Sequence, residues 1–410
     1  MGRREKIIVG LDIGSSKVCT LIAAVRDRGP EPTGIGIVDS RGLKKGVVVN
    51  LEETVQSIKR SVTQAEAMAK VEVESVYVGL SGSHIKSFNS RGVTPVATRA
   101  REILGEDVRK VIETARAVAL SPDREIIHIL PQEFTVDDQN GIGDPLGMVG
   151  TRLEVNVHIV TSSTTAAQNI VTAVNRSGLL VADTVLEPIA AGEAILSEDD
   201  KELGVVLVDV GGGKSNIAVY HRGAVRHTVV VPVGGDHFTN DIAVGLRTII
   251  PEAERLKHEQ GCAMSSMIDP ETMLEVNGMG SRQQRTISQQ MLSDILQPRA
   301  EEIIHFMRSE IRGAGYERQV GAGVVLTGGG AKLKGFAELA EEILDLPVRL
   351  AGTTKFGKAP VERLQQLQEP EFTTVSGLVL YGDRRRRTHD FHDNSKSGFK
   401  KLFSMVRSFV

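Results

Sequence analysis

The sequence lacks tryptophan, has only two cysteines, and contains few aromatic residues, 4% of 410. The cysteines, Cys19 and Cys262, are too far apart to form a metal-binding or redox motif, so we expect a reduced cytoplasmic protein. No apolar run approaches the roughly 20 residues that a membrane-spanning helix requires. The first ten residues lead into a strand-like segment without the apolar core of a signal peptide. The net charge of -3 gives no reason to expect a nucleic-acid partner.

Glycine, by contrast, is abundant, and two glycine-containing segments repeat each other. IIVGLDIGSSKVCTLI (residues 7–22) aligns without a gap with the segment around LVDVGGGKSNIAVY (residues 207–220). The alignment pairs corresponding residues of the two turns: Asp12 with Asp209, Gly14 with Gly211, Ser15 and Ser16 with Gly212 and Gly213, and Lys17 with Lys214. A strand-like run on each side of each turn predicts two β-hairpins. Since 410 residues exceed one ordinary core, the repeat predicts two related domains, each beginning with such a hairpin.

The two turns have the composition of a phosphate-binding site. Consecutive backbone N–H groups in a glycine turn can point at an anion, and hydroxyl and lysine side chains add further donors. An aspartate before each turn suits a phosphate that carries Mg²⁺, because this ion combines carboxylate, water and phosphate oxygens. Asp12 and Asp209 would then face one metal–nucleotide, Mg²⁺ with ATP, from opposite sides of a cleft. The candidate phosphate-binding residues are Gly14, Ser15, Ser16, Lys17, Gly211, Gly212, Gly213, Lys214 and Ser215.

A third glycine turn, LTGGGA, contains Gly328, Gly329 and Gly330, follows a strand-like run and precedes a helix-like one. Its backbone could approach a base or a ribose. One such turn alone is usually only a tight turn, but two matched hairpins and a third turn in this order are much harder to obtain by chance. A Walker motif is absent, and no G-x-G-x-x-G opens a first βαβ unit, which excludes P-loop and Rossmann proteins.

The remaining segments indicate a mixed α/β organisation. Asn50 is predicted to cap a helix that begins at Leu51. Residues 83–161 read as a small α/β insertion with one helix and alternating strands. Further on, residues 252–301 predict helices and polar loops, with a separate helix at 302–313.

The three turns resemble the phosphate-1, phosphate-2 and adenosine motifs of the actin, Hsp70 and sugar-kinase superfamily. VLEPIAAGEAIL (residues 185–196) resembles its connecting helix. This resemblance implies an α/β, actin-like fold of two RNase-H-like domains around a nucleotide cleft that holds ATP and Mg²⁺. PEAERLKHEQGCA resembles the superfamily helix whose Glu and Lys reach the ribose and base, which points to Glu254 and Lys257.

Within the superfamily the chain is most similar to the FtsA family of bacterial cell-division proteins, over nearly its whole length. SRGLKKGVVVNLEETVQSIKRSVTQAE, VYVGLSGSHIKS with HILPQEF, and SRQQRTISQQMLSDILQPRAEEI carry this resemblance. It implies a division of the chain into subdomain 1A (1–82 and 162–200, closed by 359–383), an FtsA-type 1C insertion (83–161), subdomain 2A (201–235 and 302–358), subdomain 2B (236–301), a flexible linker (384–395) and an amphipathic membrane-targeting helix (396–410).

The same resemblance implies a function. Members polymerise on the cytoplasmic face of the cell membrane at the division septum, anchor the FtsZ ring and recruit later divisome proteins. The FtsZ C-terminal peptide docks on subdomain 2B in this family, so Arg285 and Arg299 are the candidate contacts; a solvated helix face is the alternative.

Two positions depart from the family pattern. The phosphate-2 motif of FtsA relatives reads GGGT followed by an Asp, where this chain has Lys214 and Asn216. Lys214 either contacts phosphate directly or projects into solvent, and Asn216 removes a carboxylate. Glu187 stands where Hsp70-like relatives keep an acid that orients water, although an acid there also favours the helix dipole. We therefore expect ATP binding with at most slow hydrolysis.

The last 15 residues, KSGFKKLFSMVRSFV, have the pattern of an amphipathic helix. Apolar side chains repeat at helical spacing at Phe399, Leu402, Phe403, Val406, Phe409 and Val410, and Lys400, Lys401 and Arg407 occupy other faces. Such a helix lies in the interface of an anionic membrane. Docking on the protein's own core is the alternative, and the polar stretch 384–395 argues against it.

Four other classes of protein share parts of this pattern. A pilus-assembly ATPase shares the hairpins and a similar insertion but does not need the tail, and a sugar or acetate kinase requires a substrate pocket with a catalytic base. A shape filament of the MreB type carries a 1B subdomain in place of 1C. An Hsp70 requires a β-rich domain after residue 382. The first two remain alternatives to the FtsA function.

Overall fold

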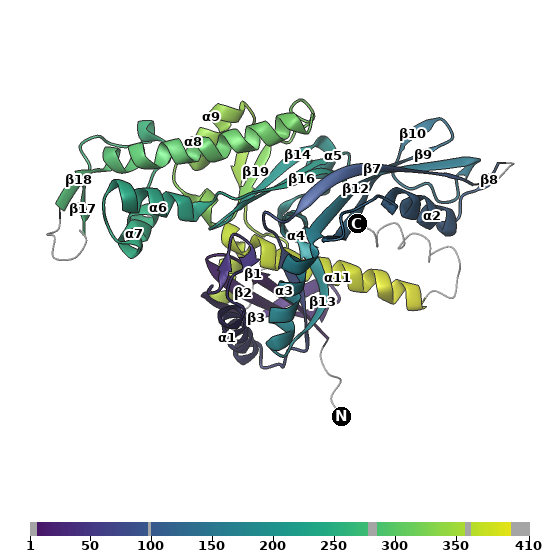
Figure 1. Cartoon of the computed structure of the whole chain (residues 1–410), viewed down its shortest axis with the longest axis horizontal. Helices are drawn as coiled ribbons and strands as arrows, with labels where there is room; N and C mark the ends of the chain where they lie inside the picture. The colour runs from purple at the N-terminus through teal and green to yellow at the C-terminus, as the bar shows by residue number, and fades with distance from the viewer. Residues whose placement is uncertain (1–5, 97–99, 278–284, 357–361, 395–410) are drawn as a thin grey trace.

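The computed structural model describes residues 6–96, 100–277, 285–356 and 362–394. Within these residues, two five-stranded sheets share one strand pattern (Figure 1). In each sheet three consecutive strands form an antiparallel meander, and two parallel strands extend the sheet beside the first of the three. The predicted division into two related domains is therefore confirmed.

Domain 1 is built on the first sheet. Its strands, in spatial order, are β13 (Leu180–Leu186), β6 (Ser75–Leu80), β1 (Ile7–Ile13), β2 (Lys17–Arg26) and β3 (Gly29–Asp39). Side chains alternate across the sheet, so that Val9, Leu11 and Ile13 of β1 face helices α1 (Leu51–Ala69) and α3 (Thr164–Arg176). The predicted cap of α1 is present, because the Asn50 side chain accepts the N–H of Glu53 at 3.3 Å.

The opposite face of the first sheet is covered by α11 (Thr373–Asn394), which also packs on α4 (Glu187–Ile195). The two helices meet at Gly377, where a Cβ atom would lie 1.7 Å from the carbonyl oxygen of Ala190. Only glycine permits this approach. The helix α4 therefore lies between the two domains, since it also contacts β14 (Val205–Val210) and β15 (Ser215–His221).

The segment predicted as a flexible linker, residues 384–395, is helical as far as Asn394. That prediction is wrong, and three arginines at the start of the segment have acidic partners. Arg384 pairs with Glu193 at 3.5 Å, Arg385 with Asp183 at 3.8 Å, and Arg386 with Asp383 at 3.0 Å. Carboxylates on α4, on β13 and on the helix itself thus support a continuous helix where composition alone indicated a linker.

The predicted insertion forms a compact unit at one end of the long axis of the molecule (Figure 1). Its sheet has the order β10 (Gln139–Ile142), β9 (Arg124–Val136), β12 (Arg152–Ser163) and β7 (Lys86–Pro95). One face packs on helix α2 (Gly105–Arg116) around Phe134, Leu153 and Val157. The other face contacts the edge strand β16 (Ala224–Val231) of domain 2, where His158 Nε2 lies 3.0 Å from Thr228 Oγ1.

Domain 2 continues with β16, β15, β14, β19 (Val324–Thr327) and β20 (Val348–Leu350). Its helices include α6 (Gly235–Gly245), α7 (Ile250–Gln260), α8 (Gln289–Gly313) and α9 (Phe336–Leu344). The predicted separate helix at 302–313, and with it the boundary between 2B and 2A at residue 301, falls inside the single helix α8. The helix runs through Pro298, and buried residues on both sides of the proline, such as Leu296 and Ile303, join one core.

The other elements are short. They are α5 (Glu198–Leu203), α10 (Glu362–Gln365), β4 (Leu43–Lys44), β5 (Val47–Val48), β8 (Arg101–Glu102), β11 (Val149–Gly150), β17 (Met273–Val276), β18 (Arg285–Ser288), and the 3-10 turns η1 (Ser265–Met267), η2 (Gly329–Lys332), η3 (Gln366–Gln368) and η4 (Pro370–Phe372). Of the helices described, none is both long and apolar enough to span a bilayer.

Candidate functional site

The two hairpin turns and the third glycine turn meet at one cavity of about 370 Å³ between the domains. Nearly all the residues predicted to bind phosphate, metal or adenosine line it: Asp12, residues 14–17, Glu187, Asp209, residues 211–214, Glu254, Lys257 and residues 328–330. Ser215 does not. It is buried, and its hydroxyl donates to the carbonyl of Val233 at 2.7 Å, so its prediction as a phosphate donor is wrong.

The two turns have the same geometry, as the sequence repeat predicts. In the first, the N–H of Gly14 donates to the carbonyl of Lys17 at 2.9 Å. In the second, the N–H of Gly211 donates to the carbonyl of Lys214 at 3.0 Å. The register of the strands places Asn216 opposite Asp209.

The two turns approach each other closely across the cleft. A Cβ atom on Gly213 would lie 2.8 Å from Ser15 Oγ, and one on Gly212 would lie 2.9 Å from Asp236 Oδ1 and 3.2 Å from Ser16 Cβ. The Ser15 hydroxyl is buried without a hydrogen-bond partner among the described residues. An unsatisfied buried donor beside glycine turns fits an oxygen-rich anion such as a phosphate group.

A buried polar network lies beside the second turn. Lys214, only 5% exposed, donates from Nζ to Glu187 Oε1 at 2.8 Å and to the carbonyl of Ser81 at 3.1 Å. Asn216 donates from Nδ2 to Glu187 Oε2 at 2.9 Å and to Asp209 Oδ2 at 3.3 Å. Lys214 thus does not project into solvent. Each oxygen of Glu187 accepts one of these hydrogen bonds, and its role in positioning water stays a prediction.

The environment of the two aspartates before the turns disfavours the ionised form of each side chain. Burial, followed by the nearby Glu187 carboxylate, raises the pKa of Asp12 to about 7 and that of Asp209 to about 6. The ammonium of Lys214 opposes both shifts. Negative charge at the site is therefore only partly compensated by the protein itself.

The donor set fits phosphate groups better than a metal ion held by protein alone. In the described part of the chain, no three His, Cys, Asp or Glu side chains are grouped to hold a metal. Asp209 already accepts from Asn216 and, at 3.4 Å, from Thr374. Mg²⁺ often keeps several waters and takes one or two carboxylates with phosphate oxygens, a role that Asp12 fits.

The residues predicted to bind adenosine line this same cavity. Lys257 Nζ, on α7, pairs with Glu254 at 2.8 Å and donates to Thr239 Oγ1 at 2.9 Å. A second cavity, of about 710 Å³, shares Ser15, Ser16, Gly213, Asp236 and Glu254 with the first. Through these shared residues the two cavities form one groove. Sequence reasoning missed Asp236, although its Gly-Gly-Asp context at the start of α6 was a usable signal.

The arginines predicted to hold the FtsZ peptide lie outside this groove. Arg285, in β18, is exposed and donates to the carbonyl of Leu246. Arg299, in α8, forms a bidentate pair with Asp241 at 2.7 and 3.1 Å and also pairs with Glu302. The predicted membrane-binding residues 396–410 lie outside the described residues, so that helix stays a prediction.

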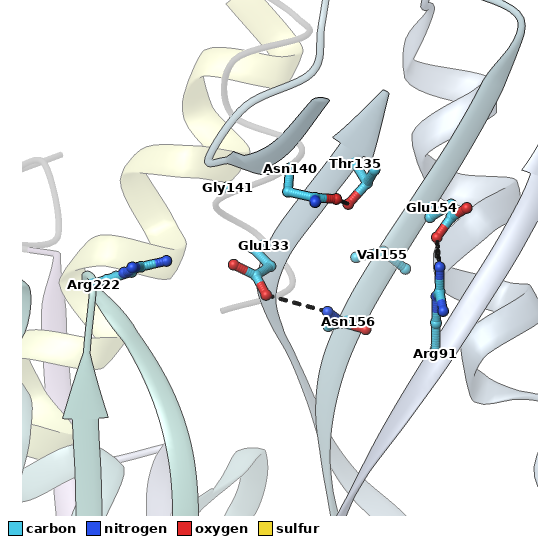
Figure 2. Close-up of a pocket in the computed structure, with 9 residues that line it drawn as sticks. All are labelled: Arg91, Glu133, Thr135, Asn140, Gly141, Glu154, Val155, Asn156 and Arg222. Carbon is cyan, nitrogen blue, oxygen red and sulfur yellow. Dashed lines mark hydrogen bonds and ion pairs between the residues drawn. The ribbon is translucent and has the colours of Figure 1, made fainter. Parts of the chain in front are cut away.

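A separate cavity of about 450 Å³ lies between the insertion and the β15–β16 turn (Figure 2). Arg91 pairs with Glu154 there, Asn156 donates to Glu133 at 3.2 Å, and Arg222 faces them from domain 2. No sequence motif indicated this cavity. Several of its polar groups bond to one another, so it carries no assigned role.

The two related domains and the cleft between them place the protein in the class with an actin-like ATPase fold. A solved PilM–PilN type IV pilus biogenesis complex matches with a TM-score of 0.67 and 18% identity, covering 92% of this chain and 98% of that one. MreB5 of Spiroplasma citri bound to ADP matches with a TM-score of 0.55 and 13% identity, covering 95% and 99%. At these identities the likeness shows the fold alone, and it confirms the predicted actin-like fold class.

Sequence comparison gives the family. The profile "Cell division protein FtsA" matches residues 206–377, and "SHS2 domain inserted in FTSA" matches residues 82–161, the predicted insertion. The chain is 46% identical to cell division protein FtsA of Pseudomonas aeruginosa over 92% of this chain and 89% of that one. It is 37% identical to FtsA of Escherichia coli K12 (92% and 90%) and to FtsA of Bacillus subtilis (97% and 87%). The chain belongs to the FtsA family and has a role in cell division.

Proposed function

We propose that this chain binds ATP, together with Mg²⁺, in the groove between its two domains. The observation that carries this proposal is the convergence of three glycine turns, separate in sequence, on one cavity that contains the unsatisfied Ser15 hydroxyl. The solved MreB5 structures of the same fold hold ADP and AMPPNP. Mg²⁺, when bound, supplies charge compensation for the phosphates. The glycine turns donate N–H groups, and Asp12 orients water around the ion.

The nucleotide site serves a membrane-tethered filament in this proposal. The protein polymerises on the cytoplasmic face of the membrane at the division septum, tethers the FtsZ ring through residues 396–410 and recruits later divisome proteins. Membership of the FtsA family and the amphipathic pattern of those residues support this function. Each Lys or Arg near an anionic surface contributes about 1 kcal/mol. One short tail is therefore weak, and polymerisation strengthens it through avidity.

Co-sedimentation with anionic vesicles and ATP tests the tether. The full chain is compared with a chain ending at Ser395 and with a full-length F403D variant, which keeps the length but places a charge on the apolar face. We expect the full chain to pellet with the vesicles and to carry FtsZ down, and both variants to stay in the supernatant. If all three remain soluble, the tail does not bind membrane, and the pilus-type alternative gains support.

A further inference from the structure

Lys214 has an unusual position for a lysine next to a phosphate-binding turn. It belongs to domain 2, but both acceptors of its ammonium group, Glu187 and the carbonyl of Ser81, belong to domain 1. The side chains of Lys214 and Glu187 are each only 6% exposed. The ammonium is therefore fixed between the domains.

The surroundings of this ammonium are acidic. Asp12, Glu187 and Asp209 line the same cavity as Lys214. Asn216 is neutral, and its single amide group bridges Glu187 and Asp209. Glu187 contacts the ammonium of Lys214 directly, and Asp209 is also buried. The other two lysines that line the cavity, Lys17 and Lys257, are more exposed than Lys214. Buried carboxylates in such numbers require nearby positive charge, which in phosphate sites is commonly a metal ion.

We propose that Lys214 is a tethered cation, which supplies at Glu187 and the adjoining end of the cleft the positive charge that a bound metal ion would otherwise supply. The inference rests on the proposed nucleotide binding. Its consequence is that this chain binds ATP with little dependence on a divalent metal. Asn216 acts in the same direction, because it holds two carboxylates together without adding a third charge to them.

The test is the affinity for a fluorescent ATP analogue, measured with Mg²⁺ and with EDTA, for the full chain and its variants. For the unmodified chain we expect the dissociation constants in the two buffers to agree within about threefold. K214M should bind at least about tenfold more weakly in EDTA than in Mg²⁺, since a charged hydrogen bond contributes this much. K214R, which keeps the charge, should restore metal independence.

Two further variants make the test specific. K201M removes a lysine that lies outside the cleft and whose Nζ pairs with Glu198 at 3.0 Å. It should leave the ratio between the two buffers unchanged. Should K214M fail to fold, N216D carries the test, because an added carboxylate beside Lys214 must also make binding metal-dependent.

The outcomes separate the inference from the proposed function. If the unmodified chain binds ATP only with Mg²⁺ and K214M and N216D show the same ratio, the tethered-cation inference is overturned while nucleotide binding stands. If the unmodified chain binds no nucleotide in either buffer, the proposed function itself fails, and the inference with it.

Discussion

The ion pair between Lys214 and Glu187 offers a sharp test of how the two domains are held together. Its atoms lie 2.8 Å apart, and both side chains are 6% exposed. Replacing Lys214 with methionine leaves Glu187 buried, with only the amide of Asn216 as donor. Removing one partner of a buried pair typically costs about 3–5 kcal/mol, so we expect a loss in unfolding free energy near 3 kcal/mol.

The cost should depend on which partners remain. E187Q leaves the ammonium with the carbonyl of Ser81 and should also destabilise the protein. In the double variant K214M/E187Q neither charge is left unpaired, and replacement of a buried pair by neutral groups is often nearly neutral. We therefore expect the double variant to be more stable than K214M, with a coupling energy of about 2 kcal/mol.

Urea denaturation followed by circular dichroism at 222 nm measures this cycle. The matched control is the surface pair Arg116–Glu113, whose atoms lie 3.4 Å apart and whose side chains are 53% and 57% exposed. The cycle R116M/E113Q should give a coupling of at most about 0.5 kcal/mol. A loss below about 1 kcal/mol for K214M, or additive effects in the first cycle, would refute the buried interdomain pair.

Three further predictions address the cleft and subdomain 2B. The folded-state pKa of Asp12 is raised from 3.8 to about 7, so the stability that its protonated form contributes is fully present below pH 3.8 and is lost as the pH rises through about 7. D12N should therefore raise the melting temperature at pH 8 but not at pH 4. An equal rise at both pH values would contradict this prediction. G212L, whose side chain would meet Asp236 and Ser16, should weaken ATP binding by more than about tenfold, whereas G143L, at a glycine with no heavy atom within 4 Å of an added Cβ, should bind normally. R285A should weaken binding of an FtsZ C-terminal peptide by about fivefold, measured by fluorescence anisotropy, while the exposed-arginine control R318A should have no effect.

The sequence predicted those parts of the fold that depend on local chemistry. The hairpins follow from strand-like runs around glycine turns, and the start of α1 follows from Asn50, whose side chain reaches a backbone group only three residues away. The insertion was recognisable because its strands alternate between apolar and polar residues. In each case the determining contacts lie within a short stretch of the chain.

The incorrect predictions for α11 and α8 concern segments whose structure depends on contacts with residues far away in the sequence. Nothing near Arg384 in the sequence indicates Glu193, so the helical end of α11 looked like a linker. The predicted separate helix at 302–313 is part of α8, because buried residues on both sides of Pro298 pack into one core. The position of Ser215 could have been predicted, because side chains alternate along a strand and Ser215 lies between Lys214 and Asn216, which both face the cleft.

The contacts of the two hairpin lysines show that the internal repeat extends beyond the hairpins. Lys17 pairs with Glu371, two residues before α11 begins, and Lys214 pairs with Glu187, the first residue of α4. The helix α11 packs on β1 and β2, and α4 packs on β14 and β15. Each hairpin thus packs against a helix, and a glutamate at or just before the N-terminus of that helix pairs with the lysine of the hairpin turn.

The two copies of this arrangement differ in burial, and that difference assigns their roles. The Lys17–Glu371 pair spans 3.7 Å with side chains 23% and 33% exposed, whereas the Lys214–Glu187 pair spans 2.8 Å at 6% exposure. Solvent screens the first pair, which therefore contributes little to stability. The second pair joins groups of different domains away from solvent, and opening the cleft at this point would separate its charges. The Lys214–Glu187 pair therefore links the two domains beside the cleft, whereas the Lys17–Glu371 pair is too exposed to act in this way.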